Sequence, residues 1–150
     1  MNNKVEYASE CFSNGFNCAQ SVFSAFCEDF GLDKSQALKV ACSFGGGMGY
    51  LGEVCGAVSG AFMVLGLIYG QNQAHESQKK AQTYLKVKEF AQRFREMNGA
   101  INCTELLKYD LGDEEQLNAA RQAGIFKINC AKYIGDAVGI LEEMIAEQNG

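Results

Sequence analysis

The segment from Val54 to Tyr69 carries no charged side chain, and Ser59 is its only clearly polar residue. It is shorter than the ~20 residues that a membrane-spanning helix needs, and the polar run Gln71-Asn72-Gln73 follows it directly. A helix that is apolar on every side must be covered by other parts of the protein. Glycines spaced four apart would let another helix lie close to one face, and they stand at 52, 56 and 60. We therefore predict a buried, Gly-rich central helix at about 54–69 and no membrane insertion.

The rest of the chain shows helical periodicity interrupted by Gly and Asn. The sequence has no proline and 17 glycines, which suits long helices joined by glycine-bearing turns. Besides the central helix, we expect helices over 5–13, 17–30, a segment capped by Asp33, 74–97, 103–109, 113–123 and 130–147. The only strand-like run is Ile125 to Ile128, and it is short. The prediction is an all-α, compact multi-helix bundle in which residues 1–150 form a single domain.

A glycine-rich segment precedes the central helix. Gly45 to Gly49 cannot form regular helix, and residues 47–52 match the G-x-G-x-x-G pattern of dinucleotide sites. That interpretation requires a preceding strand and a later acidic residue, whereas the preceding residues look helical and positions 71–73 are Gln, Asn and Gln. We therefore expect a close-packed turn and no nucleotide site.

Composition excludes several classes of protein. The chain is 47% hydrophobic and 21% charged, which is a globular balance and not that of a disordered chain. The net charge is −5, and Lys and Arg are spread along the sequence without a basic face. Nucleic-acid binding depends on such a face, so we expect none. The Gly-rich helix face and mild surface charge are compatible with a homodimer, and the sequence identifies no other partner.

Seven cysteines are the other unusual feature. An odd count does not suit a disulfide framework, and the first residues, Met1 to Glu6, show no apolar leader. We therefore expect a cytoplasmic protein whose thiols are free, metal-bound or redox-active. No two cysteines form a C-x-x-C pair, so a thioredoxin-like motif, a zinc ribbon and a covalently attached haem are not indicated.

Three cysteines directly follow an asparagine that could cap a helix. Asn17-Cys18-Ala19-Gln20 has the capping-box pattern, Asn102-Cys103-Thr104-Glu105 repeats it, and Asn129-Cys130 keeps the asparagine without the acidic partner. Cys55 would lie in the first helical turn after Gly52. Free backbone N–H groups and the helix dipole favour an anion at a helix start. We therefore expect a lowered pKa for these four thiols, as in reactive or metal-binding cysteines.

The remaining cysteines, Cys11, Cys27 and Cys42, fall inside helices or near their ends. A free cysteine in such a place usually packs as a small apolar residue. The same packing role could also hold for all seven.

Long segments of the chain match a known pattern. They are Phe16–Val22, Phe44–Gly49 and Gly52–Ala61, with Cys55-Gly56-Ala57-x-x-Gly60 at the centre, followed by single cysteines at 103 and 130. Over roughly residues 16–140 the sequence resembles the C_GCAxxG_C_C family of redox-active bacterial proteins. The resemblance implies four family cysteines at Cys18, Cys55, Cys103 and Cys130, the same four that the capping argument selects.

Two chemistries fit four converging thiols. The leading hypothesis is a thiol redox protein, in which one thiolate attacks an electrophile and a second cysteine resolves the product. Cys55 is the expected nucleophile, because its glycine neighbours leave it accessible. The alternative is a tetrathiolate metal site holding zinc or an iron–sulfur cluster on Cys18, Cys55, Cys103 and Cys130. A helical interaction module with all cysteines buried is a third, weaker hypothesis.

Overall fold

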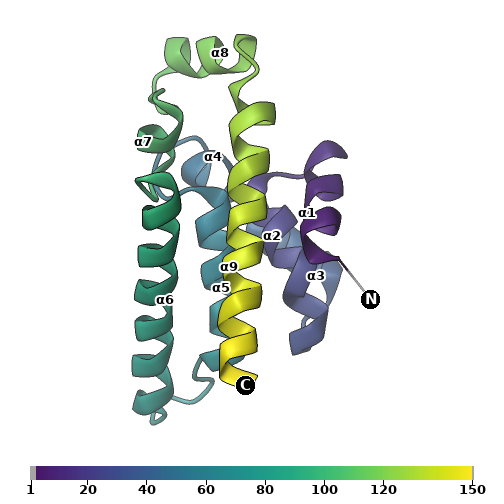
Figure 1. The fold of residues 1–150 in the computed structure, drawn as a ribbon, viewed down its shortest axis with the longest axis vertical. Helices are drawn as coiled ribbons and strands as arrows, with labels where there is room; N and C mark the ends of the chain where they lie inside the picture. The colour runs from purple at the N-terminus through teal and green to yellow at the C-terminus, as the bar shows by residue number, and fades with distance from the viewer. Residues whose placement is uncertain (1–2, 150) are drawn as a thin grey trace.

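The computed structural model describes residues 3–149, in which helices surround the apolar helix α5 (Figure 1). The elements in chain order are α1 (Lys4–Ser13), α2 (Cys18–Phe26), the 3-10 helix η1 (Cys27–Phe30), α3 (Lys34–Cys42), α4 (Gly45–Met48), α5 (Gly56–Tyr69), α6 (Ser77–Asn98), α7 (Cys103–Leu107), α8 (Glu114–Gln122), the π-helix η2 (Phe126–Cys130) and α9 (Ala131–Asn149). Residues 3–149 contain no strand, which confirms the all-α prediction.

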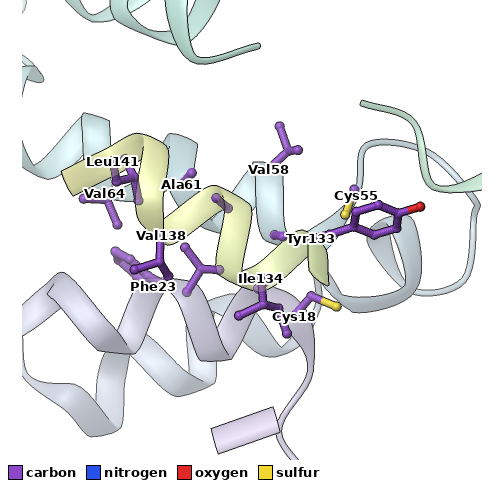
Figure 2. Packing of buried hydrophobic residues seen from close by; sticks show 14 of the residues in the cluster. Cys18, Phe23, Cys55, Val58, Ala61, Val64, Tyr133, Ile134, Val138 and Leu141 are labelled. Carbon is purple, nitrogen blue, oxygen red and sulfur yellow. The ribbon is translucent and has the colours of Figure 1, made fainter. Parts of the chain in front are cut away.

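Helix α5 is the centre of the hydrophobic core, as its composition predicted. It packs against α2, α6 and α9, and side chains such as Val58, Val64 and Leu65 are completely buried. Figure 2 shows apolar residues of α5 and α9 meeting Phe23 of α2. Within the described residues, no helix is both long and apolar enough to cross a membrane.

Glycines allow α2 and α5 to approach each other closely. A Cβ atom at Gly60 would lie 2.8 Å from the backbone oxygen of Ala19, and one at Gly56 would lie 3.0 Å from the Ala19 nitrogen. A side chain at Gly60 would force the backbone of α2 to shift, and one at Gly56 would make an unusually tight contact with it. The glycine repeat predicted that another helix would lie close to this face of α5, and that helix is α2.

We expect Gly60→Ala to destabilise the protein by about 1–3 kcal/mol, because the added methyl group forces α5 away from the backbone of α2. Gly66 is the matched control. It lies in the same helix, and a Cβ there would meet no atom within 4 Å. Gly66→Ala should stabilise the protein by about 0.5–1 kcal/mol, because alanine is the better helix former. Urea unfolding of both variants measures the difference, and equal effects would contradict the packing argument.

The glycine-rich segment between α3 and α5 includes α4, whose Gly46 and Gly47 do not have α-helical backbone angles, so this segment is a left-handed turn and not regular helix. Gly46 and Gly47 have φ values of 68° and 69°, and Gly49 and Gly52 have values of 65° and 74°. Tyr50, which is not a glycine, is also left-handed with φ 65°. Helix α3 precedes this turn, so the G-x-G-x-x-G pattern lacks the strand that a dinucleotide site needs. The prediction of a turn in place of regular helix is confirmed.

The chain before α9 differs from the prediction. Residues 125–128 are not extended, because η2 covers Phe126–Cys130 and continues directly into α9. Asn129 therefore lies inside a helical run, where its backbone is already part of the helix, and does not act as an N-cap. The expected helix start at Cys130 is wrong for the same reason.

Candidate functional site

A cavity of about 260 Å³ lies where the starts of α2, α5 and α7 meet η2. The cysteines that line it come from different parts of the chain and are Cys18, Cys55, Cys103 and Cys130. Figure 2 shows Cys18 and Cys55 near Tyr133, at one end of the packed core. Cys11 and Cys27 are buried away from the cavity, and Cys42 is exposed. The structure thus brings together the four cysteines that the sequence singled out.

Cys18 is held in place by the capping box that its sequence predicted. The Gln20 backbone N–H donates to Asn17 Oδ1 and the Asn17 N–H donates to Gln20 Oε1, both at 2.9 Å. The Asn17 side chain also donates to the Cys42 carbonyl at 2.9 Å, which ties the start of α2 to the end of α3. Cys18 is therefore the first residue of a firmly anchored helix.

Cys55 and Cys103 are positioned by a single antiparallel bridge between Val54 and Asn102. The Cys55 N–H donates to the Ile101 carbonyl at 2.8 Å, and the Cys103 N–H donates to the Glu53 carbonyl at 2.6 Å. In this pairing the two cysteines are diagonal neighbours on the same side of the bridge, so both side chains face the cavity. Cys55 is the N-cap residue of α5, and Cys103 is the first residue of α7.

Cys130 ends the π-helix η2, where the helix is locally widened before α9 begins. Such π-bulges occur often at functional sites. One turn later the Tyr133 hydroxyl donates to the Leu106 carbonyl at 3.2 Å, which fixes this part of the chain against α7. The widened turn is what replaces the helix start expected for Cys130.

Three of the four cavity thiols have pKa values that are raised, in the direction opposite to the one expected. Desolvation raises the pKa of Cys55 to about 12, and it also raises the pKa of Cys103 well above its ordinary value. The lowered pKa predicted from the helix dipole is therefore wrong for Cys55 and Cys103, and it is also wrong for Cys18, whose pKa is raised by its hydrogen bond with Cys130 and by burial. The free energy needed to remove the thiolate from water is larger than the stabilisation that the helix start gives it.

The thiols of Cys18 and Cys130 behave as a pair. A hydrogen bond with Cys18 lowers the pKa of Cys130, and the same interaction, together with burial, raises the pKa of Cys18. When this pair of thiols loses its first proton, Cys130 is therefore the sulfur that carries the negative charge. Cys130 also raises the pKa values of both Cys55 and Cys103 through its charge, so it lies near all three other cysteines.

The sulfurs are not grouped as metal ligands. In the part of the chain from residue 3 to residue 149, no three Cys, His, Asp or Glu side chains lie close enough together to hold a metal ion. A tetrathiolate site on these cysteines would require the sulfurs to move towards one another.

The comparisons with known proteins agree with the cysteine pattern. The family described as "Putative redox-active protein (C_GCAxxG_C_C)" matches residues 16–144. The chain belongs to this C_GCAxxG_C_C family. Searches of curated proteins and of solved structures found no match. The motif residues Cys55, Gly56 and Gly60 lie at the start of α5. Cys55 and Gly56 line the cavity, and Gly56 and Gly60 make the close contact with α2.

Sequence reasoning missed the aromatic wall of the cavity. The side chains of this wall come from α1, the turn after it, the glycine-rich segment, η2 and α9, and they are Phe12, Phe16, Tyr50, Phe126 and Tyr133. They belong to no common motif and share no spacing. Only the tertiary structure of this C_GCAxxG_C_C protein places them around the thiols.

Proposed function

We propose that this protein transfers two electrons by cycling Cys18 and Cys130 between a dithiol and a disulfide. The observation that carries the proposal is the convergence of four cysteines on one cavity, within which Cys18 and Cys130 interact directly. Membership of a family described as redox-active supports the same chemistry. Oxidation removes two electrons and two protons from the two thiols and joins the sulfurs in a disulfide. A small thiol oxidant accepts the two electrons and the two protons.

Cys130 is the thiol that reacts first in this proposal, and Cys18 is the thiol that resolves. The thiolate is the nucleophilic form, and the lowered pKa of Cys130 makes it the most populated thiolate in the cavity. Cys18 lines the same cavity, and its pKa is raised chiefly by its interaction with Cys130, so we assign Cys18 the closing of the disulfide. Cys55, favoured from the sequence as the nucleophile, stays protonated at neutral pH because its pKa is about 12.

Cys55 and Cys103 form a second thiol pair in the same cavity. They face the same side of the Val54–Asn102 bridge, and both lie close enough to Cys130 to be influenced by its charge. After Cys130 has been oxidised, either can exchange with it and release Cys18 as a thiol. We therefore propose that Cys55 and Cys103 react only after Cys130 has been oxidised.

Limited oxidation tests the proposal. We expect a limiting amount of diamide, added to the reduced protein without oxygen, to give mainly a Cys18–Cys130 disulfide, mapped by mass spectrometry of the digested protein. Cys42 is exposed and could link two chains, so the experiment is run in parallel on Cys42→Ser.

Random pairing, or pairing that leaves Cys130 reduced, would contradict the proposal. Stoichiometric zinc or iron in protein purified without oxygen would instead support the tetrathiolate alternative, which uses the same four cysteines.

A further inference from the structure

The cavity also restricts what can oxidise the thiols. We infer that the electron acceptor is a small, uncharged, flat molecule of the quinone class and that neither glutathione disulfide nor a protein disulfide serves this role. The inference rests on the proposed dithiol chemistry and adds the class of substrate to it. Burial, charge, shape and proton balance support it separately.

Burial excludes large substrates. The exposed fractions of the four cysteines are 7% for Cys18, 3% for Cys55, 5% for Cys103 and 6% for Cys130. Thiol–disulfide exchange requires the incoming sulfur to reach the attacking sulfur directly. A disulfide on another folded protein cannot approach thiols enclosed to this extent. The volume of about 260 Å³ also lies below the ~300–1,000 Å³ of pockets for drug-sized ligands, which favours a compact molecule.

Charge excludes ionic substrates. None of the described residues lining the cavity is Asp, Glu, Lys, Arg or His. A charged group placed there would lose its hydration and find no ion partner, which is strongly unfavourable. Glutathione disulfide carries several charged groups, so it is unsuited to this cavity by its charge as well as by its size.

Shape favours a flat ring. Aromatic side chains line the cavity together with the thiols, among them Phe16, Phe126 and Tyr133. Aromatic faces and edges pack well against a planar π-system. A ring is therefore a better complement to these walls than a flexible chain of the same volume.

Tyr50 adds a wall at the outer side of the cavity. Tyr50 is 44% exposed, and its ring packs so closely against Gly46 that a Cβ atom at position 46 would collide with the ring. The guanidinium carbon of Arg121 lies 5.2 Å from the centre of the ring. The left-handed backbone at Tyr50 is a strained conformation for a residue with a side chain, and such strain often marks a functional position.

The proposed reaction leaves no charge behind in this apolar space. The Cys18 and Cys130 thiols together lose two electrons and two protons, and one S–S bond forms. The quinone gains the same two electrons and two protons, and its two carbonyl oxygens become hydroxyl groups. Both the reactants and the products are neutral overall, as an uncharged cavity requires.

Duroquinone is a suitable probe because its ring is fully methylated and has no free position for thiol addition. We expect it to oxidise the reduced protein without oxygen at least about tenfold faster than glutathione disulfide at equal concentration. Absorbance follows hydroquinone formation, and mass mapping identifies the Cys18–Cys130 disulfide.

A carboxylate placed in the wall provides the structural test. Phe16 is 37% exposed, so Phe16→Asp should be tolerated while it introduces a charge beside the cavity. We expect this variant to bind duroquinone at least about tenfold more weakly in a titration followed by tyrosine fluorescence. Leu85→Asp is the matched control, since Leu85 is 66% exposed on α6 and does not line the cavity. It should bind like the parent protein, and circular dichroism verifies that both variants are folded.

The outcomes separate this inference from the proposed function. If diamide forms the Cys18–Cys130 disulfide but duroquinone does not, or if glutathione disulfide reacts equally fast, the substrate class is wrong and the dithiol chemistry stands. Equal duroquinone binding by Phe16→Asp and Leu85→Asp would also overturn the inference. If diamide itself fails to join Cys18 to Cys130, the proposed function fails.

Discussion

Replacing Cys130 by serine should slow alkylation of the cavity thiols at pH 7 by at least about tenfold, because it removes the thiol with the lowered pKa. The Cys18 thiol that remains is still buried, and Cys55 and Cys103 keep pKa values raised by burial. Brief treatment with iodoacetamide, followed by mass spectrometry of each cysteine, measures the rates. The measurement is made in a Cys42→Ser background, so that an exposed thiol outside the cavity does not consume the reagent.

The labelling rates of Cys130 and Cys55 should depend on pH in different ways. A lowered pKa means that the thiolate persists to lower pH, so labelling of Cys130 should reach half its maximal rate below the pH found for the same chain unfolded in urea. The pKa of Cys55 is about 12, so its labelling should stay slow until the solution is strongly alkaline. Cys55→Ser is the matched control and should leave the rate at Cys130 nearly unchanged. Faster labelling of Cys55 than of Cys130 at neutral pH would refute the assignment.

Gly47→Ala should destabilise the protein by about 2–5 kcal/mol. The backbone there has φ 69°, a left-handed conformation that costs a residue with a side chain roughly 1–2 kcal/mol. The new Cβ would also lie 2.8 Å from the Cβ of Cys103 and 2.8 Å from the Glu53 nitrogen. Overpacking of this kind costs about 1–3 kcal/mol more. Urea unfolding measures the loss.

Gly124→Ala separates the two contributions. Gly124 has nearly the same backbone conformation, φ 68°, but a Cβ there meets no atom within 4 Å. This control should lose only the ~1–2 kcal/mol of the left-handed conformation. Gly47→Ala should also alter the labelling rate of Cys103, whereas Gly124→Ala should not. Equal losses of stability would show that the cavity wall can accommodate the methyl group.

Local patterns in the sequence were sufficient for the helices. The uncharged stretch ending at Tyr69 predicted the buried helix, and Asn17, Asp33 and Asn102 cap helices as predicted. These features depend on neighbours within a few residues, so the sequence alone contains them. The helix-start argument and the family resemblance both selected the same four of the seven cysteines, and these four line the cavity.

The errors arose where distant residues decide the outcome. Asn129 resembles a helix cap, but the preceding residues wind into a π-helix that continues into α9. Cys55 does lie at a helix start, yet burial by the surrounding elements raises its pKa. The role of Cys130 depends on its contact with Cys18, a residue far away in the chain. Local spacing cannot predict any of these effects, because each arises from tertiary packing.

The bridge between Val54 and Asn102 has a consequence for how the protein must be synthesised. Thr104 and Gly52, which hydrogen bond beside this bridge, are 52 positions apart in the chain. Closing so long a loop has an entropic cost, so these contacts should form after the local helices. Until then the seven thiols are attached to a flexible chain, in which an oxidant would join them without selectivity. A nascent chain therefore has to remain reduced until α6 has folded back and the cavity has closed around the correct sulfurs.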